Sequence, residues 1–311
     1  MDMSIRDELA QHSPAGDSAV TIGVFDGVHR GHRHLLSSLR REAGRTARAS
    51  VVVTFRNHPA SVIRPGFKPR FLTTVEERLR LIKDTGIDIV APVTFGLEFS
   101  KIRAREFAAL LQERMRMKQL VVGPDFAMGH RREGDVSMLA SLGEEMGFSV
   151  AVVEPFIGDD GEVIKSTLAR AALSRGDIAR VSNLLGRPFG LSGTVVKGRG
   201  RGGPMGFPTA NLEVAEAIAA PGNGIYATWA HVGEDRYMAA TSIGVRPTFK
   251  EGDHTVEAYL MDFEGDLYGR DIRLEFMDRL RDELGFDSVE ALQEQIDKDV
   301  HRTRAVLEAS G

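Results

Sequence analysis

Thr209 and Asn211 lie two residues apart, directly after a rigid proline and a glycine-rich, basic stretch. In an extended chain, side chains two residues apart point the same way, so a hydroxyl and an amide oxygen can face one hard cation. The stretch from Lys197 to Gly206 offers flexible backbone N–H groups and positive charge, both of which phosphate oxygens need. The pattern indicates Mg²⁺ that carries a nucleotide phosphate; a surface linker followed by an ordinary turn is the alternative.

Two histidines, His29 and His32, are separated by only Arg30 and Gly31. They follow a predicted buried strand and lead into a predicted helix, whose N-terminal N–H groups favour a phosphate. As cations or as hydrogen-bond donors, the histidines can stabilise charge on an α-phosphate and on a departing pyrophosphate. A metal-binding pair or two surface histidines is the alternative. The position between strand and helix, with glycines that let backbone approach phosphate, favours the nucleotide site.

A third group consists of Ser166, Thr167 and Arg170. The two hydroxyls can donate to phosphate, and the arginine, one helical turn later, can neutralise a triphosphate. The alternative is that Ser166 only caps a surface helix. Asp125 is a further candidate, because it lies directly after a predicted strand and close to a glycine.

Composition limits the remaining possibilities. The chain has 311 residues, which suggests two domains. Its hydrophobic fraction of 42% is enough to form a hydrophobic core in each. With 40 basic and 44 acidic residues the net charge is −4, which argues against nucleic-acid and membrane-surface partners. There is no cysteine, so disulfides and thiolate chemistry are excluded. No apolar run is long enough for a membrane span and the first residues are polar, so we expect a cytoplasmic protein.

The order of the predicted elements favours an α/β domain followed by a small β-barrel. Apolar runs at 19–25, 50–55, 87–94, 119–123 and 148–155 alternate with amphipathic stretches, as in βα units with a mostly parallel sheet. Beyond residue 186 short alternating segments at about 191–197, 225–231, 237–245, 254–263 and 270–277 predict an antiparallel barrel. A final amphipathic helix over 288–307 is expected to pack across it. We therefore predict domains at 1–186 and 187–311.

At motifs in both predicted domains the chain resembles the bacterial bifunctional riboflavin kinase/FAD synthetase family. The kinase half matches at Pro-Thr-Ala-Asn, which ends at Asn211, and again in order at 222–226, 242–249, 256–260 and 262–269. The adenylyltransferase half matches at Gly-x-Phe-Asp-Gly-x-His-x-Gly-His, which ends at His32. The resemblance implies a Rossmann-like nucleotidyltransferase domain and a riboflavin kinase barrel. It also implies the substrates ATP, riboflavin and FMN, with Mg²⁺ required for both steps.

The resemblance further implies roles for individual residues. His29, His32 and Arg170 would act in adenylyl transfer, Glu257 would be the catalytic base of the kinase, and Thr209 and Asn211 would bind Mg²⁺. The remaining expected flavin- and nucleotide-binding residues are Gly23, Phe25, Asp26, Gly31, Asn57, His58, Asp125, Phe126, Ser166, Thr167, Lys197, Gly198, Gly202, Gly206 and Arg281.

Structural alternatives exist for several of these residues. Glu257 could simply lie on the solvated face of a half-buried strand. Segments 54–59 and 122–129 resemble the family's pocket-lining segments, but Phe55 and Phe126 in them could simply pack in the core. Arg281 could belong to a solvated charge run.

The chain also departs from the family pattern at several positions. Asn57 replaces a frequent proline, Met128 a phenylalanine and Ser242 a frequent asparagine, whereas Lys165 replaces a serine and Ala169 an isoleucine. The rival functions are therefore a kinase whose N-terminal half is degenerate, and a non-catalytic flavin- or nucleotide-binding regulator.

Overall fold

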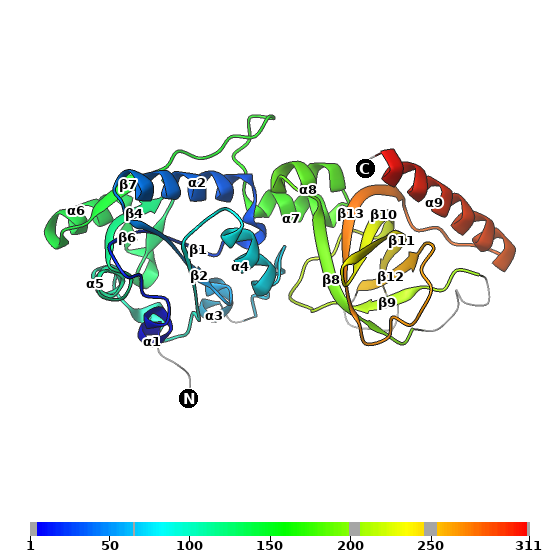
Figure 1. The fold of residues 1–311 in the computed structure, drawn as a ribbon, viewed down its shortest axis with the longest axis horizontal. Coiled ribbons are helices and arrows are strands. Elements are labelled where there is room, and N and C mark those ends of the chain that lie inside the picture. The colour runs from blue at the N-terminus through cyan, green and yellow to red at the C-terminus, as the bar shows by residue number, and fades with distance from the viewer. Residues whose placement is uncertain (1–4, 65, 199–205, 246–253, 310–311) are drawn as a thin grey trace. The chain divides into compact units, whose positions relative to one another are not determined.

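The computed structural model describes residues 5–64, 66–198, 206–245 and 254–309 (Figure 1). The contacts divide the chain into two compact units. The first unit comprises Met1–Pro69 and Thr74–Lys165, and the second comprises Arg70–Thr73 and Ser166–Gly311. This division groups helices α7 (Ser166–Ser174) and α8 (Ile178–Leu185) with the barrel. The domain boundary after residue 186 stays a prediction.

A five-stranded sheet forms the centre of the first unit, with the strand order β3-β2-β1-β4-β7. All four neighbouring pairs are parallel, which confirms the expected α/β class. The strands are β1 (Ser18–Gly23), β2 (Ala49–Phe55), β3 (Ile89–Val93), β4 (Met117–Val122) and β7 (Ser149–Val152). The order reverses between β1 and β4, and open α/β sheets bind ligands at the carboxyl ends of the strands at such a point.

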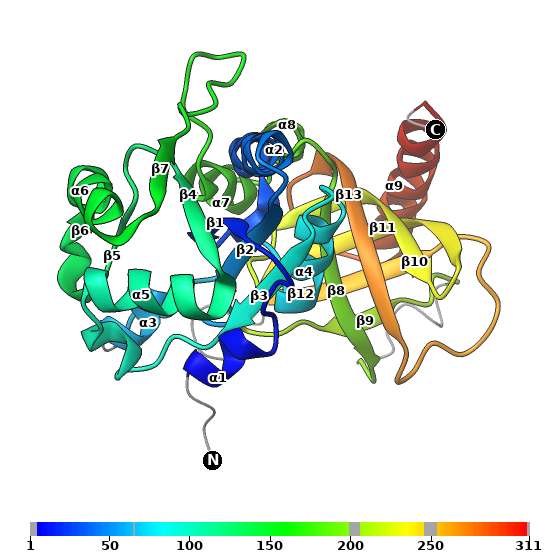
Figure 2. The same cartoon turned by 60° about the vertical axis from the view of Figure 1, so that its left-hand side comes forward.

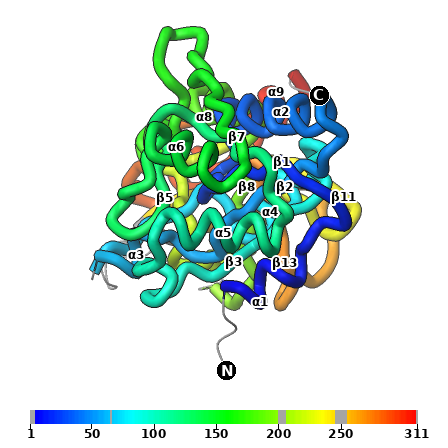
Figure 3. Tube along the Cα trace, turned by 90° about the vertical axis from the view of Figure 1, so that its left-hand side faces the viewer, coloured from blue at the N-terminus to red at the C-terminus, as the bar shows by residue number. Residues whose placement is uncertain are grey.

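Helices cover both faces of this sheet. One hydrophobic core packs α2 (Arg30–Arg45) and α4 (Val75–Lys83) against side chains such as Ala19 and Val52. The other packs α1, α5 and α6 against alternate strand residues such as Val20 and Val51. Figure 3 shows α2 and α5 on opposite sides of the strands. The remaining elements are α1 (Ile5–Ala10), η1 (Asp26–Val28), α3 (Pro59–Ile63), η2 (Phe99–Lys101), α5 (Ala104–Met115), β5 (Ala127–Met128), η3 (His130–Arg132), β6 (Gly134–Asp135) and α6 (Val136–Met146).

Side chains fix where the helices begin. The Thr74 hydroxyl accepts a hydrogen bond from the backbone N–H of Glu77 at 3.1 Å and caps α4, as the Thr-x-x-Glu spacing of a capping box favours. The carboxylate of Asp135 accepts from the N–H of Met138 at 2.9 Å and caps α6 in the same way. These caps place the helices directly after the loops that leave the sheet.

A closed antiparallel barrel in the order β10-β11-β12-β9-β8-β13 forms the second unit (Figure 2). Its strands are β8 (Phe189–Val196), β9 (Ala210–Glu213), β10 (Gly224–Val232), β11 (Asp235–Val245), β12 (His254–Leu260) and β13 (Asp271–Arg281). Alternate residues such as Tyr226 and Thr228 are buried inside the barrel. Helix α9 (Val289–Ala309) packs its Leu307 against the outer face of β10 and β13, although Val289 at its start is 58% exposed.

Candidate active sites

The first candidate site begins where β1 ends and the chain makes a left-handed turn. Phe25, Gly27 and Val28 have φ angles of 52°, 77° and 40°. Two of these three residues are not glycine, and such backbone strain persists only when the surroundings hold it in place. The Thr54 hydroxyl donates to the carbonyl oxygen of Val24 at 3.2 Å and ties the start of the turn to β2. The turn thus fixes the direction in which α2 starts.

His29 and His32 lie together at the N-terminus of α2. Their rings are stacked, with centroids 3.6 Å apart and an angle of 18° between planes. His29 Nδ1 accepts the backbone N–H of His32 at 3.2 Å and caps the helix. The edge of Phe25 packs on His32 with a centroid distance of 5.2 Å. The structure therefore brings the two predicted histidines to one point on the helix end.

The environment of His32 keeps its imidazole neutral. Burial, and then the nearby His29 and Arg78, lower the pKa of His32 well below its usual value. A neutral imidazole can donate from only one ring nitrogen. Among the described residues, Nδ1 of His32 is buried without a hydrogen-bond partner, so this nitrogen remains for a ligand. Of the two forms that the sequence allowed, the donor form rather than the cation fits His32.

Gly31 allows a close approach of the backbone. A Cβ atom at this position would lie 3.0 Å from the carbonyl oxygen of Ile164. Ile164 is buried and precedes the exposed Lys165, the last residue of the first unit. Ser166, Thr167 and Arg170 begin α7 in the second unit. Their approach to the histidines stays a prediction.

A cavity of about 620 Å³ opens at the carboxyl ends of the strands of the first unit. Gly23, Phe55, His58, Asp125 and Phe126 are the sequence candidates that line it. Its apolar wall also contains residues that the sequence interpretation missed: Phe95, Phe99, Phe107 and Ile63. Successive rings in this wall meet edge to face, with centroids 5.1 Å apart for Phe95 and Phe99 and 4.9 Å for Phe99 and Phe107. The spacing of two phenylalanines just after a predicted strand could have indicated this wall.

Two expected binding residues make other contacts. The Asn57 side chain forms two hydrogen bonds with the backbone of Phe95. Its Oδ1 accepts the Phe95 N–H and its Nδ2 donates to the Phe95 carbonyl oxygen, both at 2.9 Å. Asp26 is buried in the left-handed turn, and neither it nor Asn57 lines the cavity. Their roles in ligand binding stay predictions.

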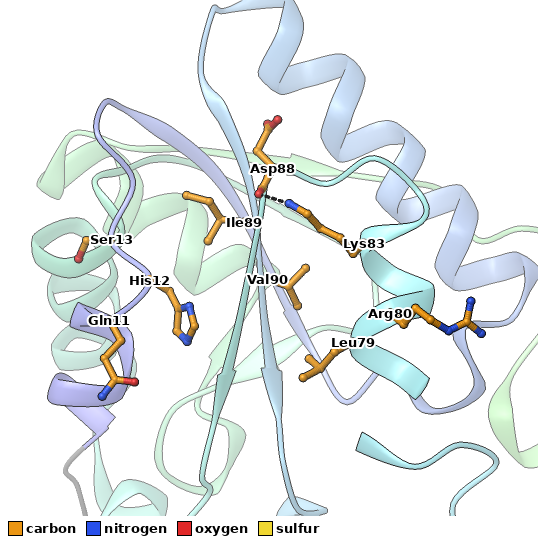
Figure 4. Close-up of a pocket in the computed structure, with 9 residues that line it drawn as sticks. All are labelled: Gln11, His12, Ser13, Leu79, Arg80, Lys83, Asp88, Ile89 and Val90. Carbon is orange, nitrogen blue, oxygen red and sulfur yellow. Dashed lines mark hydrogen bonds between the residues drawn. The ribbon is translucent and has the colours of Figure 1, made fainter. Parts of the chain in front are cut away.

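A second hollow, of about 610 Å³, lies along the edge strand β3 (Figure 4). Its walls include His12, Arg80 and Lys83, and none of the residues predicted from the sequence. The Lys83 ammonium group donates a hydrogen bond to the backbone carbonyl oxygen of Asp88 at 2.5 Å (Figure 4). This hollow lies by the start of β3, so it is separate from the carboxyl ends of the strands.

The second candidate site is a row of side chains across the outer face of the barrel. In register, Ser242 of β11 lies opposite Glu257 of β12, Glu257 opposite Asn211 of β9, and Asn211 opposite Val196 of β8. Directly opposed residues share one face, with Cβ atoms roughly 5 Å apart. Their neighbours Val256, Ala258 and Leu212 are buried on the inner face. The structure thus brings the predicted base and one predicted metal residue together.

The segments beside this row agree with a phosphate site. A Cβ atom on Gly198 would collide with the Asn211 amide, so the glycine allows the loop to pass directly over that side chain. The Phe207 ring meets Tyr259 of β12 edge to face at 5.3 Å, which places the segment before the exposed Thr209 beside the row. Lys197 and Gly206 lie at the two described ends of the loop. Gly202 and residues 246–249 of the predicted segment 242–249 lie outside the described residues.

The oxygen donors of the row suit a hard cation. The Asn211 amide and the Thr209 hydroxyl beside the row, together with nucleotide phosphates, would offer the oxygen ligands that Mg²⁺ takes. Among the described residues, no group of three or more His, Asp or Glu side chains could hold a metal ion.

Arg281 makes a structural contact. Its guanidinium forms a paired salt bridge with Asp299 of α9, with the closest atoms, Nη2 and Oδ2, 2.6 Å apart. Nε donates to the same carboxylate at 2.9 Å, and Nη1 donates to the carbonyl oxygen of Asp282. This side chain thus fastens α9 to the barrel, and its contact with flavin stays a prediction.

Two families match the chain, one in each half. The family described as FAD synthetase matches residues 11–168, and the family described as riboflavin kinase matches residues 185–307. No helix among the described residues is long and apolar enough to cross a membrane.

Whole-chain relatives agree with these matches. The bifunctional riboflavin kinase/FMN adenylyltransferase of Escherichia coli strain K12 is 37% identical over 289 residues, which cover 92% of each chain. The protein of the same description from Listeria monocytogenes is 32% identical over 93% of this chain and 92% of its own. A crystal structure described as a macrolide-efflux protein from Streptococcus pneumoniae is 30% identical and superposes with a TM-score of 0.87, covering 95% of this chain and 96% of that one.

Proposed function

Because the chain belongs to the bifunctional riboflavin kinase/FMN adenylyltransferase family, we propose that its two sites carry out successive steps of FAD formation. Riboflavin and ATP give FMN and ADP at the barrel. FMN and a second ATP give FAD and pyrophosphate at the parallel sheet. Both reactions use small molecules alone, and since both consume ATP we place the enzyme in the cytoplasm.

At the barrel, Glu257 accepts the proton of the primary ribityl hydroxyl as its oxygen attacks the γ-phosphorus of ATP. A positioned base of this kind is one of the parts that phosphoryl transfer needs, together with donors that hold the phosphates. Thr209 and Asn211 would hold Mg²⁺, which when bound neutralises charge on the phosphates. Lys197 and the glycines from Gly198 to Gly206 would cover the phosphates with N–H groups and positive charge. The register of Asn211 opposite Glu257 supports this arrangement.

At the parallel sheet, a phosphate oxygen of FMN attacks the α-phosphorus of the second ATP and pyrophosphate leaves. The N-terminus of α2 and the ring donors of His29 and His32 face the developing charge. The aromatic cavity has the size and lining that a planar flavin ring needs. Arg170, Ser166 and Thr167 would bind the triphosphate.

The observation that carries the bifunctional proposal is the stacked histidine pair, which the chain reaches through the turn that starts at Gly23 and Val24 in the cavity wall. A riboflavin kinase alone has no use for a pair of stacked histidine donors at the end of a helix in its other domain. A non-catalytic regulator has no use for a carboxylate opposite Asn211.

An end-point assay tests the proposal. The full chain is incubated with riboflavin and Mg²⁺-ATP, the flavins are separated, and ADP and pyrophosphate are counted. We expect FMN and FAD, with one ADP for each riboflavin phosphorylated, one pyrophosphate for each FAD, and no products when EDTA removes Mg²⁺. FMN alone would establish the kinase-only rival, and neither product would establish a binding protein.

A further inference from the structure

Arg78 of α4 is a buried cation next to the adenylyl transfer site. Its side chain is 1% exposed, and Nη2 donates to the carbonyl oxygen of Phe55, the last residue of β2, at 2.5 Å. Burial lowers the pKa of Arg78, and the carboxylates of Asp26 and then Glu76 oppose this shift. An arginine nevertheless stays charged in a protein. A charge in such a position is costly unless it is paired, so its location calls for a physical reason.

The surroundings of Arg78 supply that reason. Helix α4 packs against η1, the short helix that contains the buried Asp26. Asp26 lies inside the left-handed turn between Phe25 and Val28, which leads to the two histidines. The positive charge of Arg78 also acts on His32, whose pKa it helps to lower together with burial and His29. One guanidinium therefore acts on the end of β2, the turn and the histidine pair.

We propose that Arg78 is a positioning residue for adenylyl transfer. Its guanidinium holds the Asp26 turn against the end of β2, which fixes the N-terminus of α2 and its histidines in the orientation that the triphosphate requires. The arginine itself contacts neither substrate. This inference rests on the proposed roles of His29 and His32, and it adds a residue that no sequence motif indicated.

The test compares three variants of the full chain. Arg78→Met removes the charge and keeps most of the length, and Arg78→Lys keeps the charge without the planar fork. Arg80→Gln is the matched control, because Arg80 lies on the same helix but is exposed and pairs only with Asp84 in the described contacts. Steady-state kinetics of FMN adenylylation and of riboflavin phosphorylation are measured for each variant, with thermal unfolding.

Because a small misplacement of reacting groups can cost about 100-fold, we expect Arg78→Met to lower kcat/KM of FAD formation by about that factor. Riboflavin phosphorylation should remain at the parent rate, Arg78→Lys should recover part of the loss, and Arg80→Gln should match the parent. NMR titration of the His32 imidazole should show a higher pKa in Arg78→Met and a parent-like one in Arg78→Lys, because only the former loses the neighbouring charge.

The proposal is overturned if folded Arg78→Met makes FAD at the parent rate. If Arg78→Met does not fold, Arg78→Lys decides: parent kinetics with a parent His32 titration would overturn the proposal, whereas a slower rate with an unchanged titration would support it. His32→Ala tests the proposed role of His32 separately from that of Arg78. If that variant keeps adenylylation, the proposed role of His32 fails whatever Arg78 does.

Discussion

At the scale of single residues, Lys165 is where the chain departs most in charge from the family pattern. Its side chain is exposed, and the preceding Ile164 is buried with its carbonyl oxygen against Gly31. The other departure nearby, Ala169, is fully buried in α7, so it changes core packing. Lys165 is therefore the departure that can alter phosphate binding.

If the ammonium group of Lys165 meets the β- or γ-phosphate, it adds a charge-assisted bond worth about 1.5–3 kcal/mol. We expect Lys165→Ser to raise KM for ATP in FAD formation about tenfold or more, with riboflavin phosphorylation unchanged. Lys118→Ser is a suitable control, because Lys118 is an exposed lysine near the start of β4, away from the carboxyl ends of the strands. A parent that makes only FMN, and a Lys165→Ser variant that makes FAD, would mean instead that the lysine blocks the site.

At the scale of elements, the salt bridge between Arg281 and Asp299 joins β13 to α9. Asp299 is 9% exposed at its side chain and also accepts the Gln295 amide at 3.0 Å. Removing one partner of a buried pair leaves the other charge uncompensated, which costs about 3 kcal/mol or more. We therefore expect Asp299→Asn to lower the free energy of unfolding of the barrel by about 3 kcal/mol.

The single tryptophan, Trp229, reports on this barrel, since it lies on β10 in the cluster that packs under α9. Denaturant titration followed by Trp229 fluorescence measures the loss within the full chain. Asp297→Asn is the control, two residues away and exposed. Equal stability of the two variants would show that the pair does not hold α9.

The elements were predictable to different degrees, for physical reasons. Amphipathic segments such as α6 and α7 stand out because their apolar residues recur at helical spacing. Strand β9 was missed as a barrel strand because it has only four residues after a proline, too few to show an alternation. It completes the barrel and places Asn211 opposite Glu257.

The site residues also differ in how far sequence alone could indicate them. His29, His32 and Asn211 belong to local motifs, so sequence alone could indicate them. Arg78 could not be found, because it looks like an ordinary helical arginine and only the packing of α4 on η1 buries it. The aromatic wall of the cavity takes Phe95 from the loop after β3, Phe99 from η2 and Phe107 from α5. The first two follow a predicted strand and give a local signal, whereas only the tertiary fold brings Phe107 to them.

At the scale of the whole molecule, each compact unit has its own core and its own candidate site. Glu257 and His32 lie in different units, so changing one of them should not affect the reaction assigned to the other. Glu257→Gln removes the base of the kinase and should slow FMN formation about 10²–10⁴-fold. His32→Ala removes a transition-state donor and should slow FAD formation about 10²–10³-fold.

The most direct test of the two-site account is to mix these two variants in one tube with riboflavin and Mg²⁺-ATP and to measure FAD. Each variant alone should give little FAD, with FMN accumulating only for His32→Ala. The mixture should restore FAD, because FMN released by His32→Ala is adenylylated by Glu257→Gln. If either single variant loses both activities, or the mixture makes no more FAD than its components, the account of two independent sites is contradicted.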